Sequence, residues 1–222
     1  MEEIRILHTS DVHLGAPFLF LETKGGEQRI ALREALERLV KTAREERFHL
    51  LVVAGDLFDA AVEVSDADVS FAIRCLSGAG PLCRVVILPG GHDCYAAGSV
   101  YERERGRFEE SGNVHILAPG RRVIEFPDLS LAVHGAALTS NVPRESGFAG
   151  LVPLEGCRWN VCLAHGSMEG FSSGLESGEE PLRAGDLDPG FDYAALGHWH
   201  SHLVVRASRP VIVYSGAPEV VA

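Results

Sequence analysis

The stretch His49-Leu50-Leu51-Val52-Val53-Ala54-Gly55-Asp56-Leu57-Phe58-Asp59 decides how this chain of 222 residues folds. Its first part is an unbroken apolar run of strand length, which predicts a buried β-strand. Gly55 then allows a sharp backbone turn, and Asp56 places a carboxylate directly after the strand. The stretch therefore predicts a central strand whose end carries a chemically useful group.

Regular elements on either side place this strand in a parallel sheet. Residues 4–7 and 84–88 are further short apolar runs that predict strands. A helical spacing of apolar residues predicts a helix over about residues 27–47, and Ser65 is the predicted N-cap of a second helix that ends near Gly78. The alternation of strands and helices predicts a parallel core with helices outside it.

The second half of the chain is rich in predicted strands. A third, charged helix over residues 100–110 closes the first half. Short strands then follow at residues 114–117, 123–126, 129–136, 159–164, 193–196, 203–205 and 211–214. Residues 141–155 and 167–190 contain many Gly, Ser, Pro and Glu residues and are predicted to be long surface loops. We expect one domain over residues 1–222, in which a second sheet faces the first.

Composition narrows the classes of protein to consider. The sequence has no apolar run of the roughly 20 residues that a membrane-spanning helix needs, and its acidic start is not a secretory signal. Five cysteines without a Cys-x-x-Cys pair favour reduced thiols, as in a cytoplasmic protein. The formal net charge of −11 argues against a general nucleic-acid binder, although bound cations or a partner could offset it.

Side chains that can bind metal follow several of the predicted strands. They are Asp11, His13, Asp56, His165, His198 and His200. In each pair spaced two apart, the side chains can point to the same side of an extended chain and hold one ion together. The repeated position of these residues predicts a hydrolytic centre with two metal ions.

Nearby residues have simpler interpretations. His134 follows an apolar run as His165 does, and we expect only one of the two histidines to be a ligand. Asp59 is expected to order its own loop, as an acceptor in an Asx-turn. No Gly-x-x-x-x-Gly-Lys loop is present, so the sequence does not predict a P-loop ATPase.

The order of these motifs resembles that of calcineurin-like metallophosphoesterases. The pattern is Asp11-x-His13, Gly55-Asp56-x-x-Asp59, Gly90-x-His92-Asp93, His165 and Gly197-His198-x-His200. Residues 8–15, 54–59, 192–198 and 214–219 also resemble the DNA-repair exonucleases of the SbcD type. The resemblance extends over nearly the whole chain.

The resemblance implies a four-layer α/β/β/α sandwich of two facing mixed sheets. It implies a first metal ion held by Asp11, His13, Asp56 and His200, and a second held by Asp56, His165 and His198. His92 would protonate or stabilise the leaving oxygen, and Asp93 would orient His92. The ions of such enzymes are commonly manganese or iron, which suits a ligand set of nitrogen and oxygen atoms.

One residue departs from the family motif. The family has Gly-Asn-His-Asp, whose asparagine binds the second metal, whereas this chain has Gly90-Gly91-His92-Asp93. Gly91 has no side chain to donate. We therefore expect the second metal site to be weaker than the first.

The resemblance implies a metal-dependent phosphodiesterase, namely the DNA exonuclease subunit of a bacterial repair complex in which a metal-bridging hydroxide attacks phosphorus. Its partner would be a coiled-coil ATPase of the SbcC type, and the family's C-terminal capping segment is expected to be absent. Two alternatives remain open. One is a small-molecule phosphoesterase on the same fold, and the other is a member that Gly91 has weakened catalytically.

Overall fold

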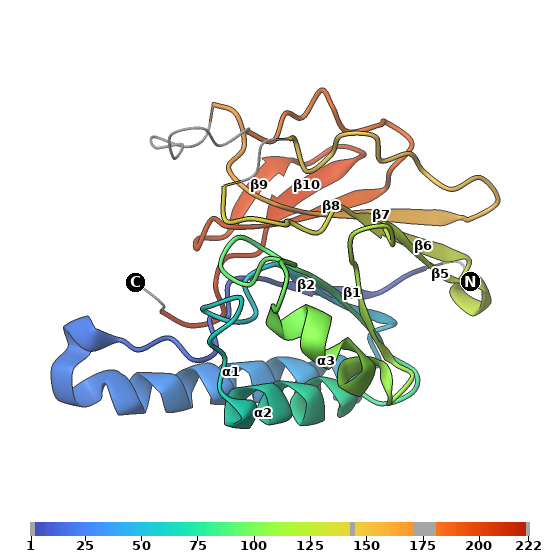
Figure 1. The fold of residues 1–222 in the computed structure, drawn as a ribbon. Helices are drawn as coiled ribbons and strands as arrows, with labels where there is room; N and C mark the ends of the chain where they lie inside the picture. Colours follow the sequence, from blue (N-terminus) through green and yellow to red (C-terminus); the bar gives the residue numbers. More distant parts are fainter. Residues whose placement is uncertain (1–2, 143–144, 171–180, 221–222) are drawn as a thin grey trace.

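The chain folds into two β-sheets stacked face to face, with three α-helices packed against the first sheet (Figure 1). The computed structural model describes residues 3–142, 145–170 and 181–220. The first sheet has the strand order β1-β2-β3-β4, and each of its pairings is parallel. These strands are β1 (Ile6–Thr9), β2 (Leu50–Ala54), β3 (Arg84–Leu88) and β4 (Val114–Ile116). The predicted parallel core is confirmed.

Strand β2 is the buried centre that its sequence predicts. All five of its residues are buried, and it pairs with β1 on one side and β3 on the other. Leu51 and Val53 face the helices, while Leu50 and Val52 face the second sheet. An apolar run without alternation fits this position because both faces of the strand are covered.

The three helices cover the outer face of the first sheet (Figure 1). They are α1 (Gly25–Glu45), α2 (Asp66–Ser77) and α3 (Val100–Glu109), and a 3-10 helix η1 (Leu19–Lys24) precedes α1. Ser65 is the N-cap of α2, as predicted, because its side chain accepts a hydrogen bond from the backbone of Asp68. Ser99 caps α3 in the same way.

The second sheet is mixed. Its strand order is β5-β6-β7-β8-β10-β9, in which the four middle strands are mutually parallel and each edge strand is antiparallel to its neighbour. The strands are β5 (Val123–Phe126), β6 (Leu131–Gly135), β7 (Trp159–His165), β8 (Tyr193–Gly197), β9 (Leu203–Arg206) and β10 (Val211–Tyr214), and η2 (Pro127–Leu129) links β5 to β6. Each of these strands lies within two residues of its predicted position at either end.

Apolar side chains from both sheets form the core between them. Val52 and Leu88 from the first sheet pack in one buried cluster with Val133, Val161 and Leu163 from the second. Burying a side chain of this size contributes about 1.5–3 kcal/mol. The sandwich therefore depends on the facing apolar surfaces of its two sheets.

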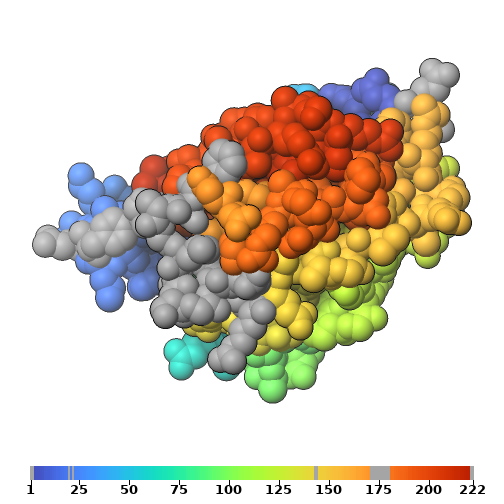
Figure 2. Space-filling view, turned by 90° about the horizontal axis from the view of Figure 1, so that it is seen from above, coloured from blue at the N-terminus to red at the C-terminus, as the bar shows by residue number. Residues whose placement is uncertain are grey.

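Loops rather than a helix cover the outer face of the second sheet in the part of the chain that the structure describes. Phe148, Leu151, Leu187 and Phe191 pack there on buried residues of β7, β8 and β10. Figure 2 looks onto this face, where yellow and orange segments lie over the sheet. The two-sheet α/β sandwich is confirmed, and the described segments that cover the second sheet are loops that contain several Gly and Pro residues.

The structure also bears on the expectations about membrane-spanning helices and cysteines. Every helix in the described ranges is too short or too polar to cross a bilayer. All five cysteines are free thiols. The parallel strands of both sheets bring their carboxyl ends to the same edge, where the predicted ligands lie.

Candidate metal centre

Loops from both sheets meet at this edge. The loop after β1 is joined to the loop after β2, because the backbone of Val12 donates to the oxygen of Asp56 at 2.8 Å. The loop after β8 is joined to the first, because the backbone of His198 donates to Asp11 Oδ1 at 3.0 Å. Residues 187 positions apart in sequence therefore share one site.

Three groups of side chains lie close enough to hold an ion. They are Asp11 with His13 and His200; His13 with Asp56 and His92; and Asp11 with Asp56 and His165. Within each group the potential ligand atoms lie within 4.8 Å of one another. The structure thus brings together five of the six predicted ligands and adds His92 to them.

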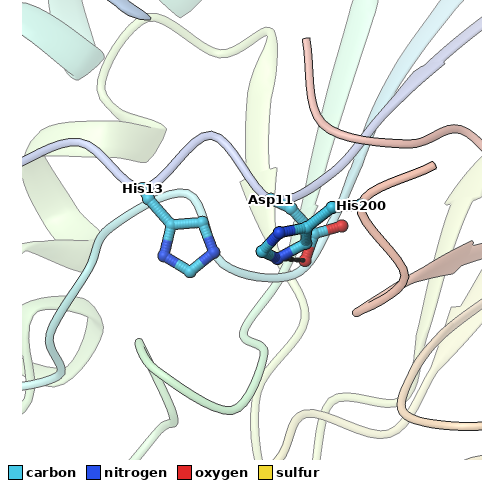
Figure 3. A group of neighbouring side chains, drawn as sticks. All are labelled: Asp11, His13 and His200. Atoms are coloured by element: carbon cyan, nitrogen blue, oxygen red, sulfur yellow. Dashed lines mark ion pairs between the residues drawn. The ribbon is translucent and has the colours of Figure 1, made fainter. Parts of the chain in front are cut away.

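The first group joins the two halves of the chain. Asp11 and His13 come from the loop after β1, and His200 approaches from the loop after β8 (Figure 3). Nε2 of His200 lies 3.9 Å from Asp11 Oδ1, and the rings of His13 and His200 have centroids 5.4 Å apart. Asp11 is fully buried, whereas the His200 side chain is 41% exposed, so the group has one side open to solvent.

Asp56 lies at the centre of the site. Its Oδ2 atom is 3.2 Å from Nε2 of His165 and 3.8 Å from Nε2 of His13. Its Oδ1 atom accepts a hydrogen bond from the backbone of His92 at 2.9 Å. One buried carboxylate therefore faces a histidine from the loop after β1 and another from the end of β7, as a bridging ligand would.

The protonation of the two buried histidines fits a metal site. Nδ1 of His165 lies 2.9 Å from the carbonyl oxygen of Ala54, and Nδ1 of His13 lies 3.0 Å from Asp59 Oδ1. Because these oxygens only accept, each Nδ1 carries the proton and each Nε2 is left as a potential metal ligand. Both Nε2 atoms are buried and, apart from the Asp56 carboxylate that they face, have no partner in the described residues. A cation between them and Asp56 would satisfy all three groups.

Charge near the site favours bound cations. Burial by itself lowers the pKa of His165, but the carboxylates of Asp56 and Asp11 more than offset this and raise the pKa to about 10. Burial by itself also lowers the pKa of His13. The hydrogen bond to Asp59 and the nearby carboxylates outweigh burial, so the pKa of His13 is raised. Burial tends to raise the pKa of Asp56, yet His165 and His13 hold it below its ordinary value. The excess negative potential that attracts protons here would also attract metal ions.

The backbone is unusual at the predicted ligands. Seven residues other than glycine have positive φ in the described chain, and four of them are Asp11, His13, Asp56 and His198. Such conformations cost of order 1–3 kcal/mol and persist where the surrounding structure imposes them. Their concentration here indicates a site maintained for function.

Two glycines allow the strand ends to approach. A Cβ atom on Gly55, which has φ of 94°, would lie 2.0 Å from Nδ1 of His165. A Cβ atom on Gly197 would lie 1.9 Å from the carbonyl oxygen of Ala54. Gly55 therefore has a second role besides the sharp turn predicted for it, because its lack of a side chain makes room for His165 from the other sheet.

Asp93, which is predicted to orient His92, has its carboxylate engaged by other groups. Its fully buried carboxylate accepts hydrogen bonds from the backbone of Gly90, Asp56 and Phe58 and from the hydroxyl of Tyr101 at 2.6 Å. It therefore clamps the loops after β2 and β3 together and does not hydrogen-bond to the ring of His92. Burial among these groups, with Asp56 nearby, raises the pKa of Asp93 to about 6.

The carboxylate that lies beside the ring of His92 is that of Asp59. Its carboxylate accepts from Nδ1 of His13 and lies 4.0 Å from Nδ1 of His92. Its carbonyl oxygen lies 3.2 Å from the same His92 nitrogen. The Gly-Asp-x-x-Asp motif could have indicated this role of Asp59 in the sequence, because it places a second carboxylate three residues after Asp56.

Two further groups support the ligands without a clear signal in the sequence. Ser10 Oγ donates to Asp11 Oδ2 at 2.5 Å and lies 2.9 Å from Ser215 Oγ. Tyr101, from α3, is fully buried beneath Asp93. Serine and tyrosine are common outside functional sites, so only the fold reveals their proximity.

The remaining candidate residues differ in how closely they approach the three ligand groups. The His198 ring lies beside that of His165, with centroids 5.5 Å apart, but His198 belongs to none of the three ligand groups. His134 is hydrogen-bonded to Asn160 at 2.9 Å within β6 and β7, so His165 is the histidine of this pair that reaches the site. Gly91 lines the cleft beside His92.

Comparisons with known proteins agree with this geometry. Residues 4–202 match the family model described as calcineurin-like phosphoesterase. The chain is 29% identical to the DNA double-strand break repair protein Mre11 of Aeropyrum pernix, over 96% of this chain and 53% of that protein. It is 24% identical to the SbcD component of the nuclease SbcCD from Bacillus subtilis, over 97% of this chain and 61% of that protein. The chain thus spans between half and two-thirds of the length of these relatives.

The fold comparison includes a crystal structure of TT1561 from Thermus thermophilus. The TM-score is 0.57 at 17% identity, with 97% of this chain and 91% of that chain covered. At this identity the likeness establishes the fold alone. The family match, by contrast, extends over most of the sequence and includes every predicted ligand. On this evidence the chain belongs to the calcineurin-like phosphoesterase family.

Proposed function

We propose that this chain is a metal-dependent phosphodiesterase that acts on DNA, as the nuclease domain of an SbcD-type repair exonuclease. One observation carries the hydrolytic part of the proposal. The buried Nε2 atoms of His13 and His165 face one carboxylate oxygen of Asp56 and have no other partner in the described residues. That arrangement suits ligands around cations better than it suits a structural network.

Divalent cations, when bound, would lower the pKa of water and polarise phosphoryl oxygens. The residues of the chain would hold the ions, and the substrate would bind beside the ions. Asp11, His13, Asp56 and His200 would form the first site, and Asp56, His165 and His198 the second. Ser10, Asp59 and Asp93 would hold these ligands in place through the hydrogen bonds described above.

His92 is the proposed proton donor to the leaving oxygen. Its side chain is 57% exposed and belongs to the group that includes His13 and Asp56. With Nδ1 directed to the carbonyl oxygen of Asp59, Nε2 is the ring nitrogen available to a substrate. A histidine beside the metals and open to solvent can both reach a leaving group and recover its proton.

The metal ions are proposed to be manganese, with iron as the alternative. The ligands are imidazole nitrogens and carboxylate oxygens without a thiolate. We expect the second ion to bind more weakly than the first, because Gly91 supplies no side-chain ligand.

The proposed DNA substrate and the proposed protein partner are inferred from the names of the relatives. The names of these relatives describe double-strand break repair and a component of the nuclease SbcCD. We propose that this chain likewise acts on DNA together with a coiled-coil ATPase of the SbcC type. Because the chain spans only part of its relatives, these roles belong to the proposal.

A second candidate is a phosphoesterase for small substrates. Two observations favour it: the formal net charge is −11, and the described lining of the cleft contains no Lys or Arg. Nucleic-acid grooves are usually basic, because cations on the protein contact phosphates. A weakened enzyme is the further alternative that Gly91 raises.

The test is a comparison of substrates in the presence of manganese. Linear single-stranded and double-stranded DNA, a cyclic nucleotide and an aryl phosphate monoester would be compared at equal enzyme concentration. The proposal predicts hydrolysis of DNA that chelator abolishes and His92→Ala strongly reduces while leaving bound metal unchanged. Turnover of the small esters alone would favour the second candidate, and absence of turnover in folded, metal-loaded protein would favour the weakened enzyme.

A further inference from the structure

A cavity of about 520 Å³ lies at the end of the first sheet that is opposite the metal centre. It is lined by Phe48 and His49, which precede β2, and by residues 79–84, which lead into β3. The metal centre lies beyond the carboxyl ends of the same strands, and a strand of five residues is about 17 Å long. The cavity is therefore a separate site that the proposed hydrolysis does not use.

The walls of this cavity are mostly apolar. Ala43, Phe48 and Leu129 line it from α1, from the loop after α1 and from η2. Leu82 belongs to the lining as well and is 82% exposed, so a ligand that covered it would remove apolar surface from water. The volume lies in the range of pockets that enclose organic ligands, about 300–1,000 Å³. The cavity can therefore take up a large apolar group.

Positive charge surrounds this apolar space. The described lining contains three arginines, Arg44, Arg47 and Arg84, and one acidic residue, Asp128. Arg84 is ion-paired with Asp128 at 2.8 Å, so the charges of Arg44 and Arg47 remain. Arg44 belongs to the last turn of α1, where a cation also offsets the partial negative charge of the helix end. In a chain with a formal net charge of −11, this local excess of arginine favours an anionic ligand.

Arg47 occupies a backbone position that glycine would fill at lower cost. It follows the C-cap of α1 with φ of 56°. Its backbone donates to the oxygen of Arg44, and the backbone of Phe48 donates to the oxygen of Ala43, which together form a Schellman motif. Glycine is usual in this left-handed position because a Cβ atom disfavours it. The exposed guanidinium of Arg47 forms no ion pair with a described residue, so the chain retains it at a cost to the fold, as expected for a group that binds a ligand.

A neighbouring cavity makes the site elongated. This cavity of about 330 Å³ shares Pro81 and Arg84 with the first and extends to Asn113 and His115, at the start of β4. The two cavities therefore lie side by side along the amino ends of β2, β3 and β4, and we call them together the amino-end groove. An elongated groove suits an extended peptide, which can fill both cavities, better than it suits a compact small molecule.

We propose that the amino-end groove binds an acidic peptide segment of a partner protein, with one large apolar side chain in the larger cavity and a neighbouring carboxylate on Arg47. A carboxylate can accept two parallel hydrogen bonds from a guanidinium, which adds geometric specificity to the attraction of charge. The acidic remainder of the chain would repel such a segment, so the arginines would direct it to this groove. Binding here would be independent of the metal ions.

The chain offers matched variants for each part of the groove. Arg47→Gly removes the guanidinium and relaxes the backbone, so it should unfold at a higher urea concentration than the wild type, and lost binding could not be ascribed to unfolding. Its control is Arg38→Ala, which removes an arginine from α1 outside the described lining. Leu82→Glu tests the apolar part, and its control is Leu19→Glu, because Leu19 is also 82% exposed and lies outside the groove.

The experiment selects peptides on the immobilised wild-type chain from a phage library of random sequences. Fluorescein-labelled copies of the enriched peptides are then titrated with each variant by fluorescence anisotropy. We expect the enriched sequences to combine aspartate or glutamate with a large apolar residue. Arg47→Gly and Leu82→Glu should each weaken binding on the order of tenfold, through the lost charge-assisted hydrogen bond and the lost apolar contact. Arg38→Ala and Leu19→Glu should bind as tightly as the wild type, and manganese or chelator should change nothing.

Several results would overturn the proposal. A library that yields no binding peptide, or peptides that bind Arg47→Gly as tightly as the wild type, would exclude an acidic peptide from the groove. Octanoate that binds the wild type but not Arg47→Gly, without any selected peptide, would assign the cavity to a small organic acid instead. A wild type that dimerises while Leu82→Glu stays monomeric would assign the groove to a second copy of the chain.

Discussion

At the scale of single residues, the site depends on two imidazole nitrogens whose one partner in the described residues is the carboxylate of Asp56. His13 and His165 use Nδ1 for hydrogen bonds within the protein and present Nε2 to Asp56. The hydrogen bond from His13 to Asp59 fixes both the tautomer and the direction of the ring. Asp59 is thus predicted to control metal binding without being a ligand itself.

Asp59→Asn should lower manganese affinity by about 10–100-fold, the usual cost of losing such a supporting group. Calorimetric titration with manganese would measure it. Asp66→Asn is the matched control, because Asp66 is an exposed acid on α2 that pairs with Arg107. Equal manganese affinities in Asp59→Asn and the wild type would contradict the assigned role.

Gly91→Asn tests the expectation of an unequal pair of metal sites. The position has room for a side chain, since the nearest atom to an added Cβ is 3.7 Å away. An added amide oxygen should tighten the weaker manganese site by about tenfold or more and leave the tighter site unchanged. Two sites of equal affinity already present in the wild type would remove the basis for this prediction.

At the scale of elements, the loops after β2 and β3 are held to α3 through Asp93. The carboxylate accepts three backbone hydrogen bonds and one from Tyr101, all within a fully buried site. An anion in such a position is stable only if its partners remain, because burial disfavours its charge. The clamp explains how the loops after β2 and β3 present Asp56 in one orientation.

Tyr101→Phe should lower the free energy of unfolding by about 1–3 kcal/mol, since it removes a hydrogen bond to a buried charged group. Urea denaturation of the metal-free protein would measure this change. Tyr95→Phe is the control, because that ring is only partly buried against the same core. A change no larger than that of the control would show that the clamp contributes little.

The elements themselves could be predicted well from the sequence. The strand of residues 84–88, the N-cap Ser65 and the short strands of the second half follow local patterns of polarity and turn residues. The covering layer of the second sheet could not be predicted, because Phe148 and Leu187 lie in segments without a repeating pattern. Likewise, the contact between Asp93 and Tyr101 joins a loop to a helix face, which no local pattern encodes.

At the scale of the whole molecule, the two sheets are also joined by a polar contact. His8 on β1 places Nδ1 2.9 Å from the hydroxyl of Tyr193 on β8, and its Nε2 atom is buried. Burial lowers the pKa of His8 to about 3. The neutral histidine is therefore part of the native interface between the sheets.

This contact predicts acid sensitivity. Unfolded histidine titrates near pH 6.5, so the contribution of His8 is full above that pH and is lost as the pH falls toward 3. Between pH 7 and pH 5, His8 should account for roughly 2 kcal/mol of lost stability. Urea denaturation of the metal-free wild type and His8→Gln at both pH values would isolate it, and the same pH dependence in both proteins would contradict the assignment.

The site as a whole was partly visible in the sequence. The order of Asp11, Asp56, His165 and His200 was sufficient to predict a common centre, because parallel strands bring their ends together. The sequence alone did not assign the supporting role of Asp59 or separate His198 from the closest groups. Those features depend on loop geometry, which local patterns leave open.

Titration of the metal-free protein with manganese, read by calorimetry and by elemental analysis after gel filtration, would show whether these residues hold a pair of ions. We expect two ions per chain with unequal affinities, and loss of both when Asp56 is replaced by asparagine, since this carboxylate is shared. Absence of specific manganese binding in the wild type, or binding that Asp56→Asn leaves unchanged, would contradict the proposed pair of metal sites.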